Sequence, residues 1–218
     1  DTHNRNNSQG IWLGYNLDRH KIGLSLDRYK LTTQTYYEGD MDSFSVRLPK
    51  VEREKVGLFY DYDVGGEFLK SIHLDAYSQT IERKFENDLV TTQVIPSPMI
   101  QALTVKNQTR THDKQYSQGV TLQSNYTLPA SNNLVLGAQY LRDKITQNSN
   151  GYTRQTAATG FFDIETTKFS HNEAVQDSTS LFAQNDWQFA DNWTWTLGAR
   201  QSWLSSRLTD GETQTTTS

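Results

Sequence analysis

Apolar residues recur at every second position over much of this chain, most clearly between residues 180 and 208. In this segment, SLFAQNDWQFADNWTWTLGARQSWLSSRL, polar residues fill most of the alternate positions, and a short turn is expected at residues 190–192. Successive side chains of a β-strand point to opposite faces. The pattern therefore predicts two long antiparallel strands, each with one apolar and one polar face. The apolar positions are Leu181, Ala183, Trp187, Phe189, Trp193, Trp195, Leu197, Ala199 and Trp203.

The same period of two predicts about eight strands along residues 1–218. Expected strands cover residues 10–18, 21–37 and 56–63, and a fourth runs from residue 70 past residue 85. A fifth ends at residue 128, a sixth starts at residue 134, and the 180–208 hairpin adds two more. Short turns are expected near residues 19, 65, 131 and 191. Long polar connections are expected at residues 38–54, 86–110 and 146–176, and the tail from residue 211 is expected to begin another loop.

This arrangement indicates an all-β fold, and three features favour a segment of an antiparallel transmembrane β-barrel. Short and long connections alternate, as they do between periplasmic turns and extracellular loops. The polar faces carry Gly, Gln, Asn, Asp and Thr, which a water-filled lumen accepts. Aromatic residues gather near the short turns, where they are expected to form a lipid-facing girdle at the membrane interface. These girdle residues are Tyr60, Tyr62, Tyr126, Trp187, Phe189, Trp193 and Trp195.

Alternation alone leaves a second fold open, because a soluble barrel also has one apolar face per strand, pointing inward. The alternative hypothesis is therefore a small soluble or adhesin-like ligand-binding β-barrel. Dependence on detergent separates the two, since a protein that stays monodisperse in plain buffer cannot expose a continuous apolar belt.

Composition narrows the picture further. The chain has 21 basic and 25 acidic residues and a net charge of −4, so no nucleic-acid footprint is present. Cysteine is absent, which excludes a disulfide scaffold. No apolar run of about 18 residues occurs, so no transmembrane helix is expected. The first ten residues, DTHNRNNSQG, are polar and loop-like, which suggests a processed chain or a segment of a larger one.

One hairpin resembles a known family. Leu-Phe-Ala-Gln at residues 181–184, an aromatic residue at Trp187, and Trp-Thr-Leu-Gly-Ala-Arg at residues 195–200 are similar to a barrel hairpin of TonB-dependent outer-membrane receptors. Barrels of that family have 22 strands around a plugged lumen. Because no plug domain is recognisable in residues 1–218, the resemblance implies that the whole chain is part of such a barrel.

The resemblance also implies a function: import of a scarce iron source across the outer membrane of a Gram-negative bacterium, driven by the TonB energy-coupling complex. Residues 48–87 look most similar to haem or haemoprotein receptors, and siderophore receptors are the close alternative. No covalently bound cofactor is expected; haem or a ferric siderophore would be the transported ligand. Expected partners are outer-membrane lipid, the TonB complex through a plug, an iron-carrying ligand or host haemoprotein, and also bacteriocins or phages.

No catalytic motif is present, so an enzyme is not expected. Two histidines near the long connections, His112 and His171, are candidate iron ligands, since neutral imidazole binds haem iron. Cations and an aromatic residue on the same side could grip an anionic or aromatic ligand by charge and stacking. These are Arg83, Lys84, Tyr152 and Arg154. The alternative for each is an ordinary solvated loop residue, and no metal site is expected within the chain.

Overall fold

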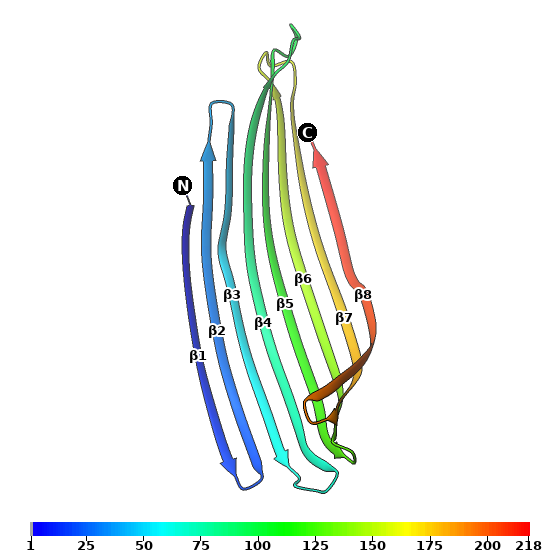
Figure 1. The fold of residues 1–218 in the computed structure, drawn as a ribbon. Coiled ribbons are helices and arrows are strands. Elements are labelled where there is room, and N and C mark those ends of the chain that lie inside the picture. Colours follow the sequence, from blue (N-terminus) through cyan, green and yellow to red (C-terminus); the bar gives the residue numbers. More distant parts are fainter. Residues whose placement is uncertain (1) are drawn as a thin grey trace.

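The computed structural model describes residues 2–218 as eight antiparallel strands in one sheet, each paired with its neighbours in the sequence (Figure 1). Strand pairing continues well beyond the segments of alternating apolar residues, so the strands are long. Their bounds are β1 Thr2–Leu17, β2 His20–Glu38, β3 Asp42–Asp63, β4 Leu69–Val94, β5 Ala102–Leu128, β6 Asn132–Ala157, β7 Asp163–Ala190 and β8 Trp193–Thr217. The predicted all-β class, the number of strands and the short turns are confirmed.

The predicted long connections are wrong. The strands continue through them, so that only residues 39–41, 95–101 and 158–162 connect β2 to β3, β4 to β5 and β6 to β7. Pro49 interrupts β3 without ending it, because the register shifts by one residue between Arg47 and Lys50. A β-bulge of this kind accommodates a residue that cannot donate to the ladder. The tail from residue 211 is likewise strand and not loop, as β8 runs to Thr217.

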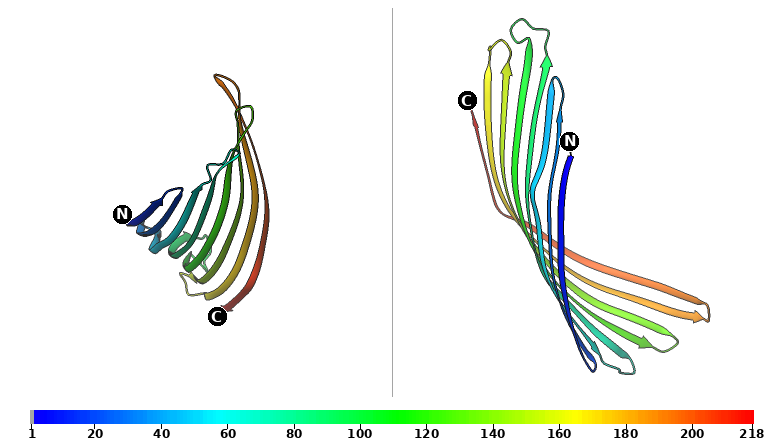
Figure 2. Two further views of the ribbon diagram at one scale, coloured as in Figure 1. Left: turned by 90° about the horizontal axis from the view of Figure 1, so that it is seen from below. Right: turned by 90° about the vertical axis from the view of Figure 1, so that its left-hand side faces the viewer.

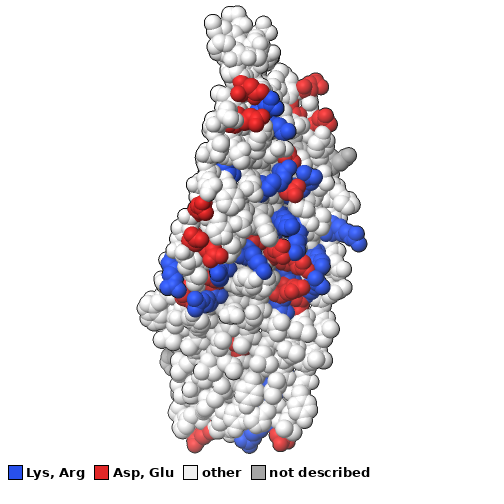
Figure 3. Space-filling model, turned by 180° about the vertical axis from the view of Figure 1, so that it is seen from behind, with Lys and Arg blue, Asp and Glu red and all other residues white. Residues whose placement is uncertain are grey.

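The sheet is strongly twisted and curved, and it remains open in this chain (Figure 2). Pairing register places the leucines of neighbouring strands side by side: Leu13 pairs with Leu24, Leu24 with Leu58, and Leu74 with Leu122. We call the face that carries them the lipid face, and the opposite face the lumen face. Viewed from the back, one half of the sheet is almost free of charge, and charged residues crowd the half toward the hairpin tips at residues 39–41, 95–101 and 158–162 (Figure 3).

A single sheet encloses no hydrophobic core. Among the described residues, the buried apolar side chains are only Ala157 and Val175, whereas Trp193 and Leu197 are 68% and 69% exposed. A continuous apolar surface of this kind is unfavourable in water and must be covered by lipid or by another protein surface. Within residues 2–218, no helix is long and apolar enough to cross a membrane.

Aromatic rings cover glycines on the lumen face. Gly23 on β2 is opposite Phe59 on β3, and Gly137 on β6 is opposite Phe182 on β7. A Cβ atom on either glycine would overlap the facing ring. Glycine is thus required at both positions for the close approach of the ring, and the rings in turn shield strand backbone that glycine leaves bare.

Candidate functional site

The six predicted ligand-binding residues all lie within strands, so the predicted placement of Tyr152, Arg154 and His171 in a connection at residues 146–176 is wrong. They also divide between the two faces of the sheet. Arg83 pairs with Asp113 and lies on the lumen face. Lys84 is its neighbour in the chain and therefore points to the opposite face. The other four share the lipid face with Lys84, namely His112, His171, Tyr152 and Arg154.

Arg83 forms part of a polar depression on the lumen face. Its Nε donates to Oδ2 of Asp113 at 2.9 Å, and Gln147 on β6 donates to the other carboxylate oxygen at 3.0 Å. The depression has a volume of about 280 Å³ and is lined by Val51, Ile81, Arg83, Asp113, Gln115, Ile145 and Gln147. The Arg83 side chain is 54% exposed, so its guanidinium retains free donors toward the lumen. This site combines a cation, amides and aliphatic walls.

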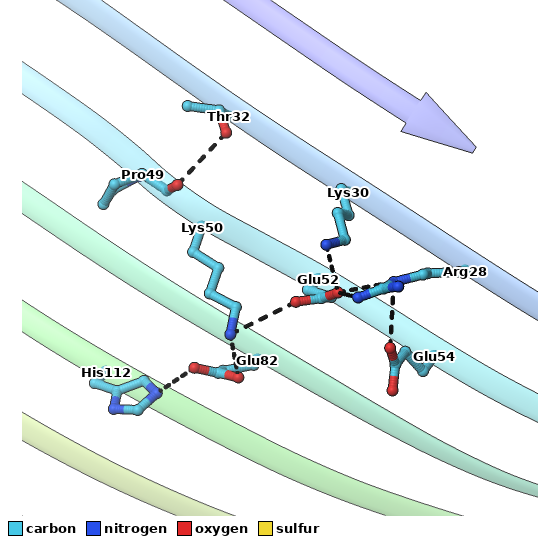
Figure 4. A network of polar contacts seen from close by, with 9 residues as sticks. All are labelled: Arg28, Lys30, Thr32, Pro49, Lys50, Glu52, Glu54, Glu82 and His112. Carbon is cyan, nitrogen blue, oxygen red and sulfur yellow. Dashed lines mark hydrogen bonds and ion pairs between the residues drawn. The ribbon is translucent and has the colours of Figure 1, made fainter. Parts of the chain in front are cut away.

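Ion pairs join β2, β3 and β4 on the lipid face, in the charged half of the sheet (Figure 4). Glu52 accepts from Arg28 at 2.5 Å and lies 3.1 Å from Lys30 Nζ, while Lys50 donates to Glu82 at 2.5 Å. Hydrogen bonds from Arg28 and then Lys30 lower the pKa of Glu52 to about 2. The hydrogen bond from Lys50 likewise lowers the pKa of Glu82. The network is nearly charge-balanced, which makes it a structural lattice and not an open binding site.

The two histidines occupy one row of the lipid face, on either side of Asn148. His112 Nε2 is 3.0 Å from Oε1 of Glu82, and His171 Nδ1 is 2.6 Å from Oδ1 of Asn148. Neighbouring strands are about 4.8 Å apart, so one intervening strand places the two backbones roughly 10 Å apart. The described residues contain no group of three or more His, Cys, Asp or Glu side chains that could hold a metal ion.

Tyr152 and Arg154 come together close to the β6–β7 tip. Tyr152 donates to Glu165 at 2.9 Å, and Arg154 binds Asp163 through Nε at 2.9 Å and Nη2 at 2.5 Å. Hydrogen bonding to Asp163 raises the pKa of Arg154, and the same bond lowers the pKa of Asp163. These partners already neutralise the cation, so this pair stabilises the hairpin tip.

The predicted girdle residues occupy the ends of the strands near the short turns, all on the lipid face. Trp187 pairs with Trp195, and the Trp187 and Phe189 rings lie 5.7 Å apart. Tyr60 and Tyr62 stack against His20 at centroid distances of 5.9 and 4.7 Å. Tyr126 pairs with Leu134. Their position is that of an interface belt, and their contact with lipid headgroups stays a prediction.

Sequence reasoning missed three polar residues of the lumen depression, Asp113, Gln115 and Gln147. The signal was present, because each keeps the parity of its strand's polar face: Gln115 is an even number of residues from Thr121, and Gln147 from Gly137. The expected loop at residues 146–176 ended that count before Gln147, whereas Asp113 and Gln115 lie between Thr121 and the expected connection at 86–110, where the count still applies.

Long antiparallel strands, a charge-free apolar band and a polar opposite face define the class of an outer-membrane β-barrel segment. Residues 1–218 match the family described as TonB dependent receptor-like, beta-barrel. The chain therefore belongs to the TonB-dependent receptor β-barrel family and lies in the outer membrane, a result that excludes the soluble-barrel alternative. The family is one of receptors and transporters and not of enzymes.

Solved structures are similar to the chain at low sequence identity. The ferric yersiniabactin uptake receptor FyuA from Yersinia pestis is 11% identical, with a TM-score of 0.48 over 97% of this chain and 44% of that one. The ferric preacinetobactin receptor BauA from Acinetobacter baumannii is 9% identical, with a TM-score of 0.31 over 99% and 43%. The chain spans less than half the length of either receptor. No curated protein matches it in sequence.

Proposed function

We propose that this chain forms part of the barrel of a TonB-dependent receptor that imports an iron complex across the outer membrane. Membership of the family over residues 1–218 is the observation that carries the proposal. Uptake would draw energy from the TonB complex through a plug domain that closes the barrel. The protein would perform no covalent chemistry on its cargo.

Between the two ligand classes, a ferric siderophore fits the described residues better than haem does. Both candidate iron-binding histidines lie on the lipid face, where Glu82 and Asn148 already engage them. Arg83, by contrast, lies on the lumen face with free donors beside Gln115 and Gln147. A guanidinium flanked by amides suits an anionic, oxygen-rich complex, because charged donors form the stronger hydrogen bonds to anionic oxygen.

Growth of an iron-starved strain tests the proposal. A strain that lacks the receptor is supplied with ferric siderophores or with haem as the sole iron source, and is complemented with the wild-type protein in the presence or absence of TonB. We expect TonB-dependent rescue on at least one siderophore. The doubly substituted His112→Ala/His171→Ala receptor should rescue equally well.

Two outcomes would contradict the proposal in different ways. Rescue on haem alone, lost in the double histidine variant, would replace the siderophore with haem. Absence of TonB-dependent rescue on every iron source, with the receptor present in the outer membrane, would reject iron import itself.

A further inference from the structure

Arg53 lies beside Arg83 on the lumen face, at the edge of the polar depression. It is in register with Ile81 on β4, while Val51, two residues along β3, is in register with Arg83. Val51 and Ile81 both line the depression, so Arg53 shares their face. The two arginines are therefore diagonal neighbours on adjacent strands, with Cα atoms about 7–8 Å apart. We call Arg53 and Arg83 the arginine pair.

The acidic residues next to Arg53 in the sequence do not neutralise it. Glu52 and Glu54 point to the opposite face, where they form ion pairs with Arg28 and Lys30. Arg53 itself is exposed and forms no hydrogen bond or ion pair with any described residue. Its guanidinium therefore keeps all its donors free on the lumen side.

The two carboxylates nearest to the arginine pair on the lumen face each have another cation as partner. Asp27 on β2 is diagonal to Arg53, but it is in register with Lys55. Asp113 on β5 is bonded to Arg83, whose Nε lies 2.9 Å from Oδ2. These residues form two pairs of opposite charge, and Arg53 is left without a counter-charge.

The next lumen-face carboxylate of the described strands is too far away to supply it. Asp143 on β6 is separated from Arg53 by three strand spacings, which places it roughly 15 Å away. It accepts hydrogen bonds from Gln115 and Ser117. Exposed charges farther apart than about 8 Å are largely screened at physiological salt. One uncompensated positive charge therefore remains at the arginine pair.

We propose that the arginine pair binds an iron complex that carries more than one negative charge on oxygen atoms at its surface. The inference rests on the proposed function and names the class of ligand within it. Like charges held close together are unfavourable, so an anion between them relieves the repulsion. Each guanidinium can form a fork of hydrogen bonds to anionic oxygen. Val51 and Ile81 lie between the two arginines and would contact the carbon frame of the ligand.

Equilibrium binding of defined iron complexes to the purified receptor tests the inference. Ferric tris-catecholate and a ferric α-hydroxycarboxylate complex are anionic, whereas ferric tris-hydroxamate has a neutral core. We expect one or both anionic complexes to bind at least about tenfold more tightly than the tris-hydroxamate. Arg53→Gln should weaken binding of the preferred anionic complex about tenfold, since one charged donor is lost. Arg53→Lys keeps the charge and should retain part of the affinity.

Lys21→Gln is the matched control on the same face. Lys21 is in register with Asp61, and its Nζ lies 5.4 Å from the centre of the Phe59 ring. It is roughly 25 Å from Arg53 along the strands. This variant should bind the anionic complex as the wild type does. Added salt should weaken binding to the wild type more steeply than binding to Arg53→Gln/Arg83→Gln.

Two results would overturn the inference: equal losses in Arg53→Gln and Lys21→Gln, or tightest binding of the tris-hydroxamate. A receptor that prefers the tris-hydroxamate and still supports TonB-dependent growth would leave iron import intact. Absence of growth on every iron source is a separate result, because it rejects the proposed function and not the charge preference measured with the purified receptor.

Discussion

Arg83 and Asp113 face each other across β4 and β5 on the lumen side of the sheet, with Arg83 Nε 2.9 Å from the aspartate Oδ2. Lys84, the next residue in the chain, points to the lipid side. Arg83 and Lys84 are therefore adjacent cations that point to opposite faces of the sheet.

We expect Arg83→Ala to weaken ligand binding and Lys84→Ala to leave it nearly unchanged. Loss of a charged hydrogen bond to an anionic ligand costs roughly 1.5–3 kcal/mol, or about ten- to a hundredfold in Kd. Equilibrium binding of the ferric siderophore to the purified receptor measures both variants. A larger loss of affinity for Lys84→Ala than for Arg83→Ala would contradict a ligand site on the lumen face.

The free energy of folding into the membrane should also differ between adjacent residues that point to opposite faces. Leu122→Arg places a charge in the middle of the lipid-facing band and should cost roughly 2–4 kcal/mol of folding free energy. Gln123→Arg, one residue away on the lumen face, should cost clearly less. Urea titration of folding into lipid vesicles measures both, and equal costs would contradict the assignment of faces.

The covered glycines predict a coupled effect. Gly137→Ala adds a methyl group where the Phe182 ring lies, and overpacking of this kind typically costs about 1–3 kcal/mol. Phe182→Ala removes the ring, so the double variant should be more stable than the sum of the two single losses predicts. Strictly additive free energies of unfolding would show that the ring does not occupy this position in the membrane.

Acid should weaken the outer part of β2–β3. The pKa of Glu52 is lowered from 4.5 to about 2 by Arg28 and Lys30, so the ionised carboxylate stabilises the folded state. That contribution is complete above the unfolded pKa near 4.5 and is lost as the pH falls toward 2. A carbon-13 NMR titration should show the low pKa, and Arg28→Gln should raise it. A Glu52 pKa that Arg28→Gln leaves unchanged would argue against the pair.

Protease added to intact cells should cut at the tips formed by residues 39–41, 95–101 and 158–162. These connections are at the end of the sheet that carries the charged residues, beyond the apolar band (Figure 3). The connections at residues 64–68 and 191–192 lie at the opposite end and should resist cleavage until the cells are opened. Cleavage at the short turns in intact cells would reverse the orientation.

The strands and their faces could be predicted wherever apolar residues mark every second position, as from Leu134 to Tyr140. Above the apolar band the same alternation continues with polar residues on both faces, so period-two hydrophobicity vanishes although the backbone stays extended. That is why residues 146–157 looked like a loop, and why Tyr152 and Arg154 were misplaced. Cross-strand partners such as Asp163 hold these segments in register, and a single sequence does not reveal which residues will be opposite each other.

Each strand of this sheet is bonded only to the strands before and after it in the chain. The architecture is therefore modular. A hairpin can be lengthened, shortened or replaced at its tip while the rest of its two strands keep the same pairing partners. A graft at residues 158–162 would alter what the cell surface displays without altering the wall within the bilayer. Such a scaffold allows the segments beyond the apolar band to change while the strands within it keep their pairing.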